Sequence, residues 1–400
     1  MKKIITLLSI SVFITSVCAQ TNTLTSKKLT QELEQIHAQG FINGFSVVIV
    51  NKDSVLYTKG FGFSDIKAHK QYTENTIQNI GSISKTFIGI ALLKAQELGA
   101  LQLDDPINKH LPFKIINPYF PNEQITIRQL STHTSSIKDP VRYYKNGYVL
   151  KEKDNPGVKV NANFRSPDEK LTMEIFFKNI LTTNGIWHKK KNFLKEKPGT
   201  RFEYSNIAAA LAAYILEQAT KESFPEFTRK HIFKPLGMQN TGWSFKDIDF
   251  SMHSKLYDSP KTELAFYSLI TYPDGGLLTS SKDMGNYLSE LVKGYTGNGT
   301  ILKQNSFKEL FKKQLSAKNY KERSENRYGD EYNSGVFMGF SAKGYIGHTG
   351  SDPGVVTFMF FNAETKIGRL LILNTELKKE GIQEFIAIWN KLEEYENNLH

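Results

Sequence analysis

The chain has 400 residues, of which 40% are hydrophobic and 23% are charged, and it carries a formal net charge of +11. This composition lies close to the average of globular proteins, so it excludes disordered, collagen-like and coiled-coil chains. With Cys18 as its single cysteine, the chain offers no intramolecular disulfide and no multi-thiolate metal site. We expect no nucleic-acid partner, because no known binding motif accompanies the basic charge.

The start of the chain has the pattern of a secretory signal peptide. Lys2 and Lys3 precede a short apolar run that ends in Val17, Cys18 and Ala19. This predicts cleavage after Ala19 and an exported protein, periplasmic or extracellular, whose mature chain lacks cysteine. Ser and Thr interrupt the run, and a membrane anchor needs about 18 consecutive apolar residues. A lipoprotein acylated at Cys18 ranks second, because the branched Val17 stands where that pattern has a small residue.

Strand patterns concentrate at the two ends of the chain and helix patterns in its middle. An amphipathic helix at 29–36 precedes a predicted hairpin of two strands at 45–50 and 55–60. The segments 87–98 and 207–216 are apolar on every face, which predicts buried helices. Three further strands and an amphipathic closing helix are expected at 345–348, 355–361, 369–374 and 382–392.

This order of elements predicts an α+β fold. We expect an antiparallel sheet built from both chain ends and flanked by helices, with an inserted, mainly helical domain. After the signal peptide at 1–19, one domain spans 20–400, with its sheet part at about 27–80 and 280–400 and its helical part at about 81–279. Ligands are expected in the crevice between these parts. The polar segment 138–170 is interpreted as a long surface excursion.

The motif Ser-x-x-Lys is the first candidate for chemistry. It places a serine and a lysine on one helical face, where an amine of lowered pKa can take the hydroxyl proton. The motif occurs at 64–67, 82–85 and 135–138. Only Ser82 and Lys85 stand at the start of a predicted buried helix, whose N-terminus favours developing negative charge. We therefore expect the reaction at Ser82.

Two further elements accompany this pair. Tyr-x-Asn occurs at 144–146, 204–206 and 395–397, and the middle copy directly precedes the second buried helix. Tyr204 could enter the crevice there as a proton shuttle, with Asn206 orienting the substrate. The sequence from Tyr345 to Gly350 ends a predicted strand that faces the same crevice. Zinc, Walker and dinucleotide motifs are absent from the sequence, so we expect no metal and no other cofactor.

In this order and spacing, the three elements resemble the serine β-lactamase and penicillin-recognising DD-peptidase family, in its class C-like branch. The resemblance extends from about 29 to 392 and includes further landmarks at 103–106, 130–136, 235–238 and 275–277. It implies that Ser82 is the nucleophile, Lys85 its activating amine, Tyr204 the shuttling acid or base and Asn206 a substrate-orienting amide.

The third element of the family pattern supplies the remaining predicted site residues. His348, Thr349 and Gly350 stand where β-lactamases carry Lys-Thr-Gly, and the resemblance implies that they bind substrate. It also implies an oxyanion hole formed by the backbone amides of Ser82 and Ser351. Histidine is mostly neutral near pH 7 and mainly donates a hydrogen bond, which favours other substrates over β-lactams. A substrate carboxylate would bind better to protonated His348.

The resemblance implies a serine hydrolase that cleaves an amide or ester bond through an acyl-serine intermediate. We expect a DD-carboxypeptidase or D-amino-acid peptidase type of activity on a small molecule or cell-wall peptide, ahead of an esterase and of a β-lactamase. From another class, the alternative is a penicillin-binding or ligand-binding protein without turnover.

The sequence also contains lysine-rich stretches. His188 is followed by three lysines, at 189–191, which could contact an anionic lipid, polysaccharide or cell wall. A solvated surface is the preferred interpretation. The sequence does not indicate an oligomeric state.

Overall fold

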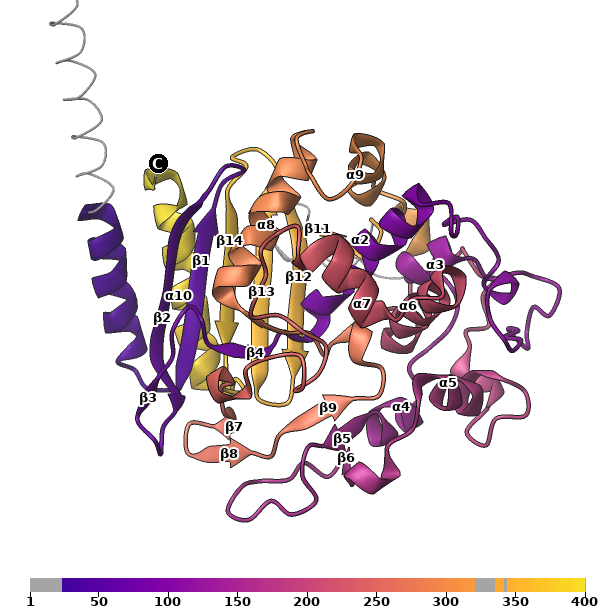
Figure 1. The fold of residues 1–400 in the computed structure, drawn as a ribbon, viewed down its shortest axis with the longest axis horizontal. Helices are drawn as coiled ribbons and strands as arrows, with labels where there is room; N and C mark the ends of the chain where they lie inside the picture. The colour runs from indigo at the N-terminus through magenta and orange to yellow at the C-terminus, as the bar shows by residue number, and fades with distance from the viewer. Residues whose placement is uncertain (1–23, 321–334, 342–343, 400) are drawn as a thin grey trace, which may run out of the picture.

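The computed structural model describes residues 24–320, 335–341 and 344–399. Its main sheet has the strand order β11-β12-β13-β14-β1-β2-β3, with every neighbouring pair antiparallel (Figure 1). Strand β1 lies between β14 and β2, so both ends of the chain build one sheet, and the expected α+β fold is confirmed. The strands are β1 Gly44–Val50, β2 Val55–Asp65, β3 Lys70–Gln71, β11 Gly339–Phe340, β12 Tyr345–Asp352, β13 Val355–Asn362 and β14 Gly368–Leu373.

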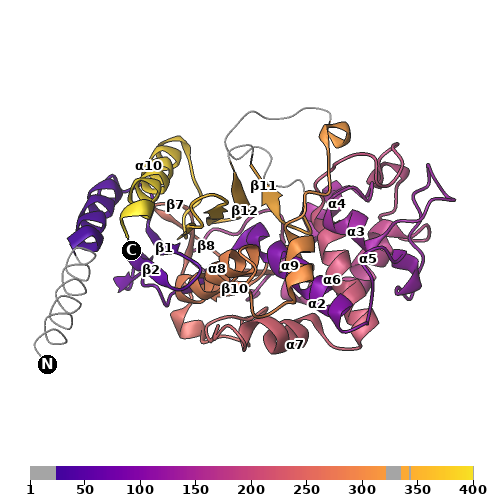
Figure 2. The same cartoon turned by 90° about the horizontal axis from the view of Figure 1, so that it is seen from above.

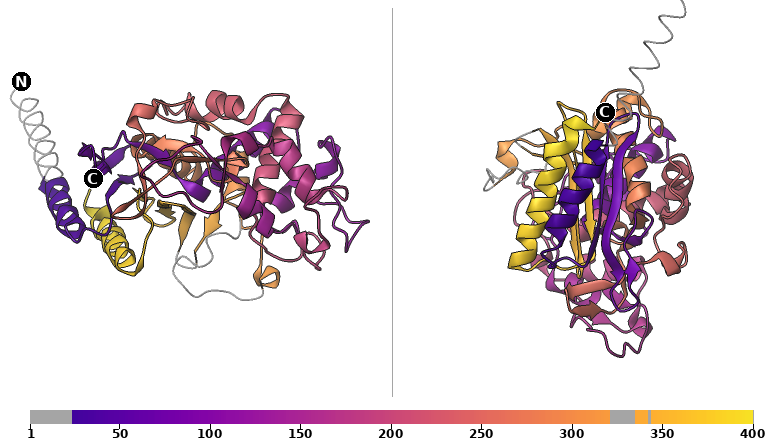
Figure 3. Two further views of the ribbon diagram at one scale, coloured as in Figure 1. Left: turned by 90° about the horizontal axis from the view of Figure 1, so that it is seen from below. Right: turned by 90° about the vertical axis from the view of Figure 1, so that its left-hand side faces the viewer.

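The sheet is covered on both faces, so its central strands β1 and β14 are buried along their whole length. Alternate residues of β1 point to opposite faces: Phe45 packs with a helix over 24–37 and with α10 (Lys379–Tyr395), while Val48 belongs to the core on the other side. Figure 3 shows the first helix and α10 side by side on one face. Helix α8 (Ser281–Tyr295) covers the opposite face.

The middle of the chain forms the helical part, placed beside the sheet in Figure 2. Its core contains α2 (Ser84–Glu97) and α6 (Asn206–Thr220), both buried along most of their length as predicted. The shorter helices are α3 Ile127–Ser131, α4 Val141–Asn146, α5 Met173–Leu181, α7 Phe224–Thr228 and α9 Gln304–Leu310. The small strand groups are β4 Ile77–Asn79 with β10 Leu278–Ser280, β5 Tyr148–Leu150 with β6 Phe164–Arg165 and β9 Tyr267–Leu269, and β7 Leu256–Ser259 with β8 Thr262–Leu264.

The segment 138–170 differs from its prediction as a surface excursion. It contains α4, β5 and β6, and Tyr143 and Val149 are buried in the main core. Pro140 directly precedes α4, where its fixed φ and missing N–H do not interrupt the helix. Because the segment is rich in polar residues, its sequence did not indicate that it forms one wall of the crevice.

The predicted signal peptide at 1–19 lies outside the described residues. The proposed division of the domain between sheet and helical parts stays a prediction. Across 24–320, 335–341 and 344–399, none of the helices combines the length and apolar character needed to cross a membrane.

Candidate active site

Ser82 lies in a single 3-10 turn, Gly81–Ile83, which leads directly into α2. Gly81 has a φ of 55°, a conformation that glycine adopts at little cost. A Cβ at this position would lie 2.8 Å from the backbone nitrogen of Ser351 in β12. The turn therefore needs glycine for two reasons, and it holds Ser82 against the end of the sheet.

Two polar side chains contact the Ser82 hydroxyl. Lys85 Nζ lies 2.8 Å from Ser82 Oγ, and the Tyr204 hydroxyl donates to the same oxygen at 2.9 Å. The Lys85 amine also donates to the backbone oxygen of Asp274 at 2.6 Å. Because Lys85 is completely buried, desolvation lowers its pKa, although nearby carboxylates oppose this shift. The amine therefore lies within hydrogen-bonding distance of the serine hydroxyl, and its lowered pKa favours the neutral form that can accept the serine proton.

Tyr204 is fixed from behind by its own segment and by His133. Ser205 caps α6 by accepting a hydrogen bond from the Ala208 amide, and the Ser205 amide donates to His133 Nδ1 at 3.2 Å. The rings of His133 and Tyr204 are 4.5 Å apart. Burial lowers the pKa of His133 well below its usual value, and the nearby charge of Lys85 lowers this pKa further. His133 is therefore a neutral positioning residue.

Asn206 also faces the site, but its amide is already engaged. Its Nδ2 donates to Asp139 Oδ2 at 2.8 Å, and the backbone amides of Asn206 and Ile207 donate to the same carboxylate. Asp139 therefore caps α6 and fixes the orientation of Asn206. The role of Asn206 as a substrate-orienting amide stays a prediction.

Strand β12 supplies the opposite edge of the site. Thr349 and Ser351 line a cavity next to Ser82, whereas Gly350 packs directly against the turn. A Cβ on Gly350 would lie 2.2 Å from the Ile80 oxygen and 3.1 Å from the Ser82 nitrogen. This close approach puts the backbone amides of Ser82 and Ser351 on adjacent segments, as the predicted oxyanion hole requires.

Gly350→Ala is expected to separate these segments. The added methyl group forces β12 away from the turn, so one amide leaves the developing oxyanion. We expect the rate of Ser82 labelling by a fluorescent phosphonate to fall by roughly 10²-fold, the effect of losing one oxyanion donor. Gly381→Ala in α10 is the matched control, since its Cβ meets only the end of the Leu377 side chain below 3.4 Å. Equal labelling rates in both variants would contradict this role of Gly350.

The position of His348 corrects an expectation. We expected its side chain to face the substrate and to bind a carboxylate when protonated. Instead it is 1% exposed and does not line the cavity. Burial lowers its pKa to about 3, and Lys85 adds to this effect. His348 Nδ1 lies 2.5 Å from the Thr349 oxygen, so this nitrogen carries the proton and the ring is neutral.

The cavity beside Ser82 has a volume of about 210 Å³ and contains two carboxyl groups. Asp274 accepts a hydrogen bond from Tyr143 at 2.9 Å, and burial raises its pKa to about 7. Asp352 accepts one from Tyr148 at 2.7 Å, and burial raises its pKa to about 6. The residues that line this small cavity are Ser82, Tyr143, Tyr144, Tyr148, Tyr204, Asn206, Asp274, Gly275, Thr349, Ser351 and Asp352.

Several of these residues were missed by sequence reasoning. Tyr143, Tyr144 and Tyr148 lie in the segment interpreted as a surface excursion, although three tyrosines within six positions were a visible sign of a packed wall. Asp274 directly precedes a glycine landmark that we interpreted only as a site of close backbone packing. Asp352 follows the third motif.

The other copies of the motifs lie elsewhere or play other parts. Ser64 is in β2 and donates to backbone oxygens of the neighbouring strand, while Lys67 pairs with Glu263. Ser135 is buried, and its side-chain oxygen accepts a hydrogen bond from the Ile137 amide.

The lysines at 189–191 are exposed. Contact with an anionic surface there stays a prediction.

A serine that contacts a buried lysine and a tyrosine, at the start of a helix beside an antiparallel sheet, is the arrangement that the resemblance to penicillin-recognising serine hydrolases predicts. The family model described as Beta-lactamase matches residues 29–393. The chain belongs to this family.

Curated relatives share part of the sequence. Protein flp of Staphylococcus aureus (strain MW2) is 27% identical over 342 residues, which are 84% of this chain and 60% of the relative. The chain thus spans about 60% of the length of this relative. Putative penicillin-binding protein PbpX of Bacillus subtilis (strain 168) is 25% identical over 86% of this chain and 76% of the relative.

Solved structures share the fold. The octameric penicillin-binding protein homologue from Pyrococcus abyssi is 25% identical, with a TM-score of 0.70 over 92% of this chain and 76% of that chain. D-amino acid amidase from Ochrobactrum anthropi SV3 is 18% identical, with a TM-score of 0.67 over 92% of this chain and 99% of that one. Beta-lactamase/D-alanine carboxypeptidase from Yersinia pestis is 20% identical, with a TM-score of 0.65 over 91% and 98%.

Proposed function

We propose that this protein hydrolyses the amide bond of a D-amino-acid amide or short peptide that carries a free, positively charged amine. Ser82 attacks the carbonyl, and Lys85 takes its proton. The leaving amine departs with a proton delivered through Tyr204, and water then releases the acyl group from Ser82. Of the two activities expected from the sequence, this proposal selects the D-amino-acid peptidase type.

The observation that carries the proposal is the charge of the small cavity. Among the described residues, its lining contains the carboxyl groups of Asp274 and Asp352 and no lysine, arginine or histidine; the Lys85 amine contacts Ser82 but is not part of this lining. A substrate ammonium group placed there would favour the ionised form of both acids and gain charge-assisted hydrogen bonds. A substrate carboxylate would meet like charge, because the buried, neutral His348 offers it no compensating cation.

Two parts of the proposal rest on other grounds. The D configuration follows from the family resemblance, and a D-amino acid amidase shares the fold with this chain. Export follows from the pattern of residues 1–19 and is tested by determining the N-terminus of the protein recovered from the producing cell.

A substrate panel tests the proposal directly. It contains D- and L-phenylalanine amide, N-acetyl-D-phenylalanine amide, a D-Ala-D-Ala peptide blocked at its amine, a p-nitrophenyl ester and a chromogenic cephalosporin. We expect the largest kcat/KM for D-phenylalanine amide and a loss of roughly tenfold or more on N-acetylation, which removes the charge. Preference for the blocked dipeptide would establish a carboxypeptidase, and preference for the ester an esterase.

The carboxyl group of Asp352 should make substrate binding depend on pH. Since its pKa is about 6, it is ionised above that pH, while an α-ammonium group keeps its proton up to about pH 8. We therefore expect KM for D-phenylalanine amide to fall as the pH rises from about 5 to 7. Asp352→Asn should raise KM roughly 10- to 100-fold near neutral pH and remove the part of this dependence centred near pH 6, leaving the part due to Asp274, whose pKa is about 7. The same KM in Asp352→Asn and in the control Asp53→Asn, in the exposed hairpin turn, would contradict the assignment.

A further inference from the structure

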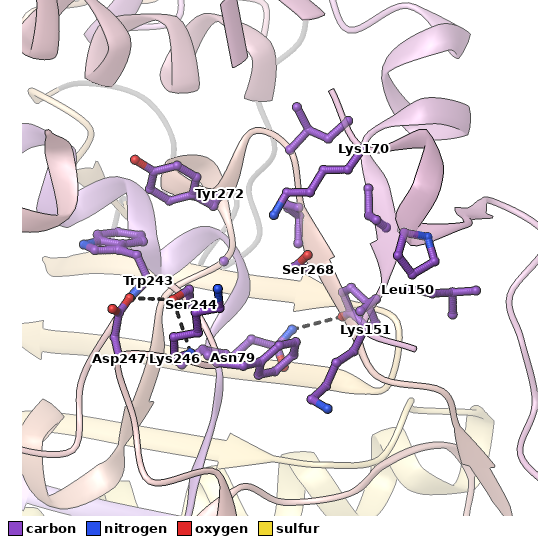
Figure 4. A pocket seen from close by; sticks show the side chains of 18 of the residues that line it. Asn79, Leu150, Lys151, Lys170, Trp243, Ser244, Lys246, Asp247, Ser268 and Tyr272 are labelled. Atoms are coloured by element: carbon purple, nitrogen blue, oxygen red, sulfur yellow. Dashed lines mark hydrogen bonds between the residues drawn. The ribbon is translucent and has the colours of Figure 1, made fainter. Parts of the chain in front are cut away.

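A second, larger cavity of about 920 Å³ is shown from close by in Figure 4. Tyr272 and Gly276 line this large cavity, whereas Asp274 and Gly275 line the small one. The two cavities therefore share one thin wall but have separate linings. Nothing in the mechanism at Ser82 uses the large cavity.

The interior of the large cavity is built for an apolar body. Its walls come from β5, β9 and the turns around Trp243 and Tyr272, and they include Leu150 and Phe250. The rings of Trp243 and Tyr272 lie 5.8 Å apart on one side. Volumes of this size, with mostly apolar and aromatic walls, are typical of sites for small organic ligands.

The charges at the mouth indicate the polar end of such a ligand. Lys170 and Lys246 are exposed, and Figure 4 shows both side chains directed into the cavity. In the described residues, neither amino group pairs with a carboxylate.

The other charged residues of the lining already have partners. Lys151 pairs with Glu152, and its ammonium lies 4.7 Å from the centre of the Phe250 ring. Asp247 accepts hydrogen bonds from the Trp243 amide at 3.2 Å and from the Ser244 hydroxyl at 2.8 Å. These hydrogen bonds fix the Asp247 carboxylate without neutralising it, so the three lysines of the lining, set against Glu152 and Asp247, leave a formal net charge of +1.

We propose that the large cavity is a second binding site, which takes an amphipathic anion. The apolar body of the ligand occupies the space lined by Trp243 and Tyr272, and its single carboxylate or phosphate group lies between Lys170 and Lys246. This site is separate from the one at Ser82, so both can be occupied together. The inference does not depend on which bond Ser82 cleaves.

Displacement of 1-anilinonaphthalene-8-sulfonate, a fluorescent amphipathic anion, tests the proposal. The probe is bound to the full protein and titrated with dodecanoate, dodecyl phosphate or dodecyltrimethylammonium. We expect both anions to displace it and the cation to compete at least tenfold less well. The ratio of the two anion affinities separates a carboxylate from a phosphate ligand. Equal competition by the cation would overturn the proposal, because the lysines would then have no part in recognition.

Variants locate the binding. The double variant Lys170→Glu/Lys246→Glu should bind dodecanoate roughly tenfold more weakly, while Lys190→Glu/Lys191→Glu, in an exposed turn away from both cavities, should bind it unchanged. Ser268→Trp should fill the space and abolish binding. Labelling of Ser82 by the phosphonate reports that each lysine variant is folded. Unchanged affinity in the Lys170/Lys246 variant would overturn the site.

Occupation of Ser82 distinguishes the two cavities. Protein whose Ser82 carries the phosphonate should still bind dodecanoate with the same affinity. Loss of binding after labelling would place the anion in the small cavity and would also overturn the proposal.

Discussion

We expect Ser82→Ala to abolish labelling by a fluorescent phosphonate and to lower hydrolysis of the best panel substrate by a factor on the order of 10⁵ to 10⁶, as the loss of a nucleophile does. The reason is geometric: within the described chain, the Ser82 hydroxyl is the one that contacts both Lys85 and Tyr204. Because the serine is partly exposed, its replacement should hardly change the melting temperature.

The other two Ser-x-x-Lys serines are the controls for this experiment. Ser64→Ala and Ser135→Ala should both keep the label, because neither hydroxyl contacts a lysine amine of the described residues; each is engaged with backbone groups of its own surroundings. Mass spectrometry then locates the adduct. An adduct on any residue other than Ser82 would refute the assignment.

Lys85→Arg is expected to lose acylation as fully as Lys85→Ala, by roughly 10² to 10⁴-fold. The buried lysine acts as a base only because burial lowers its pKa and favours the neutral amine. A guanidinium group cannot be deprotonated in a protein and so cannot accept the serine proton. Rates of phosphonate labelling and of substrate hydrolysis in single turnover measure the effect.

Lys85→Met separates lost chemistry from lost folding. Methionine keeps much of the volume and removes an amine that must be desolvated, so its melting temperature should equal or exceed that of the parent. Acylation should be absent all the same. Substantial acylation in Lys85→Arg would mean that the lysine supplies positive charge and not a basic amine.

The main sheet and the contact between Ser82 and Lys85 were predictable because their signals are local. Phe45 to Val50 alternates between two buried faces, so its composition alone indicates a central strand. Ser82 and Lys85 are three positions apart at the start of a helix without a polar face. In both cases the residues that determine the structure are neighbours in sequence.

The acidic character of the site was not predictable in this way. Asp139, Asp274 and Asp352 come from three distant segments, and their raised pKa values result from burial that only the folded chain creates. The same is true of His348, which a strand pattern places near the crevice without showing that its ring is buried. Pattern and motif thus predicted which serine lies beside the buried lysine, whereas the polarity of its surroundings depends on long-range packing.

The pairing of β1 with β14 also has a consequence for biosynthesis. Phe45 lies opposite Leu373, so the sheet cannot close until nearly all of the chain has left the ribosome. The turn that carries Ser82 rests on β12, which is also translated late. A nascent chain therefore contains Ser82 before it contains the strand that completes the cavity, so we expect no hydrolysis until translation is almost finished.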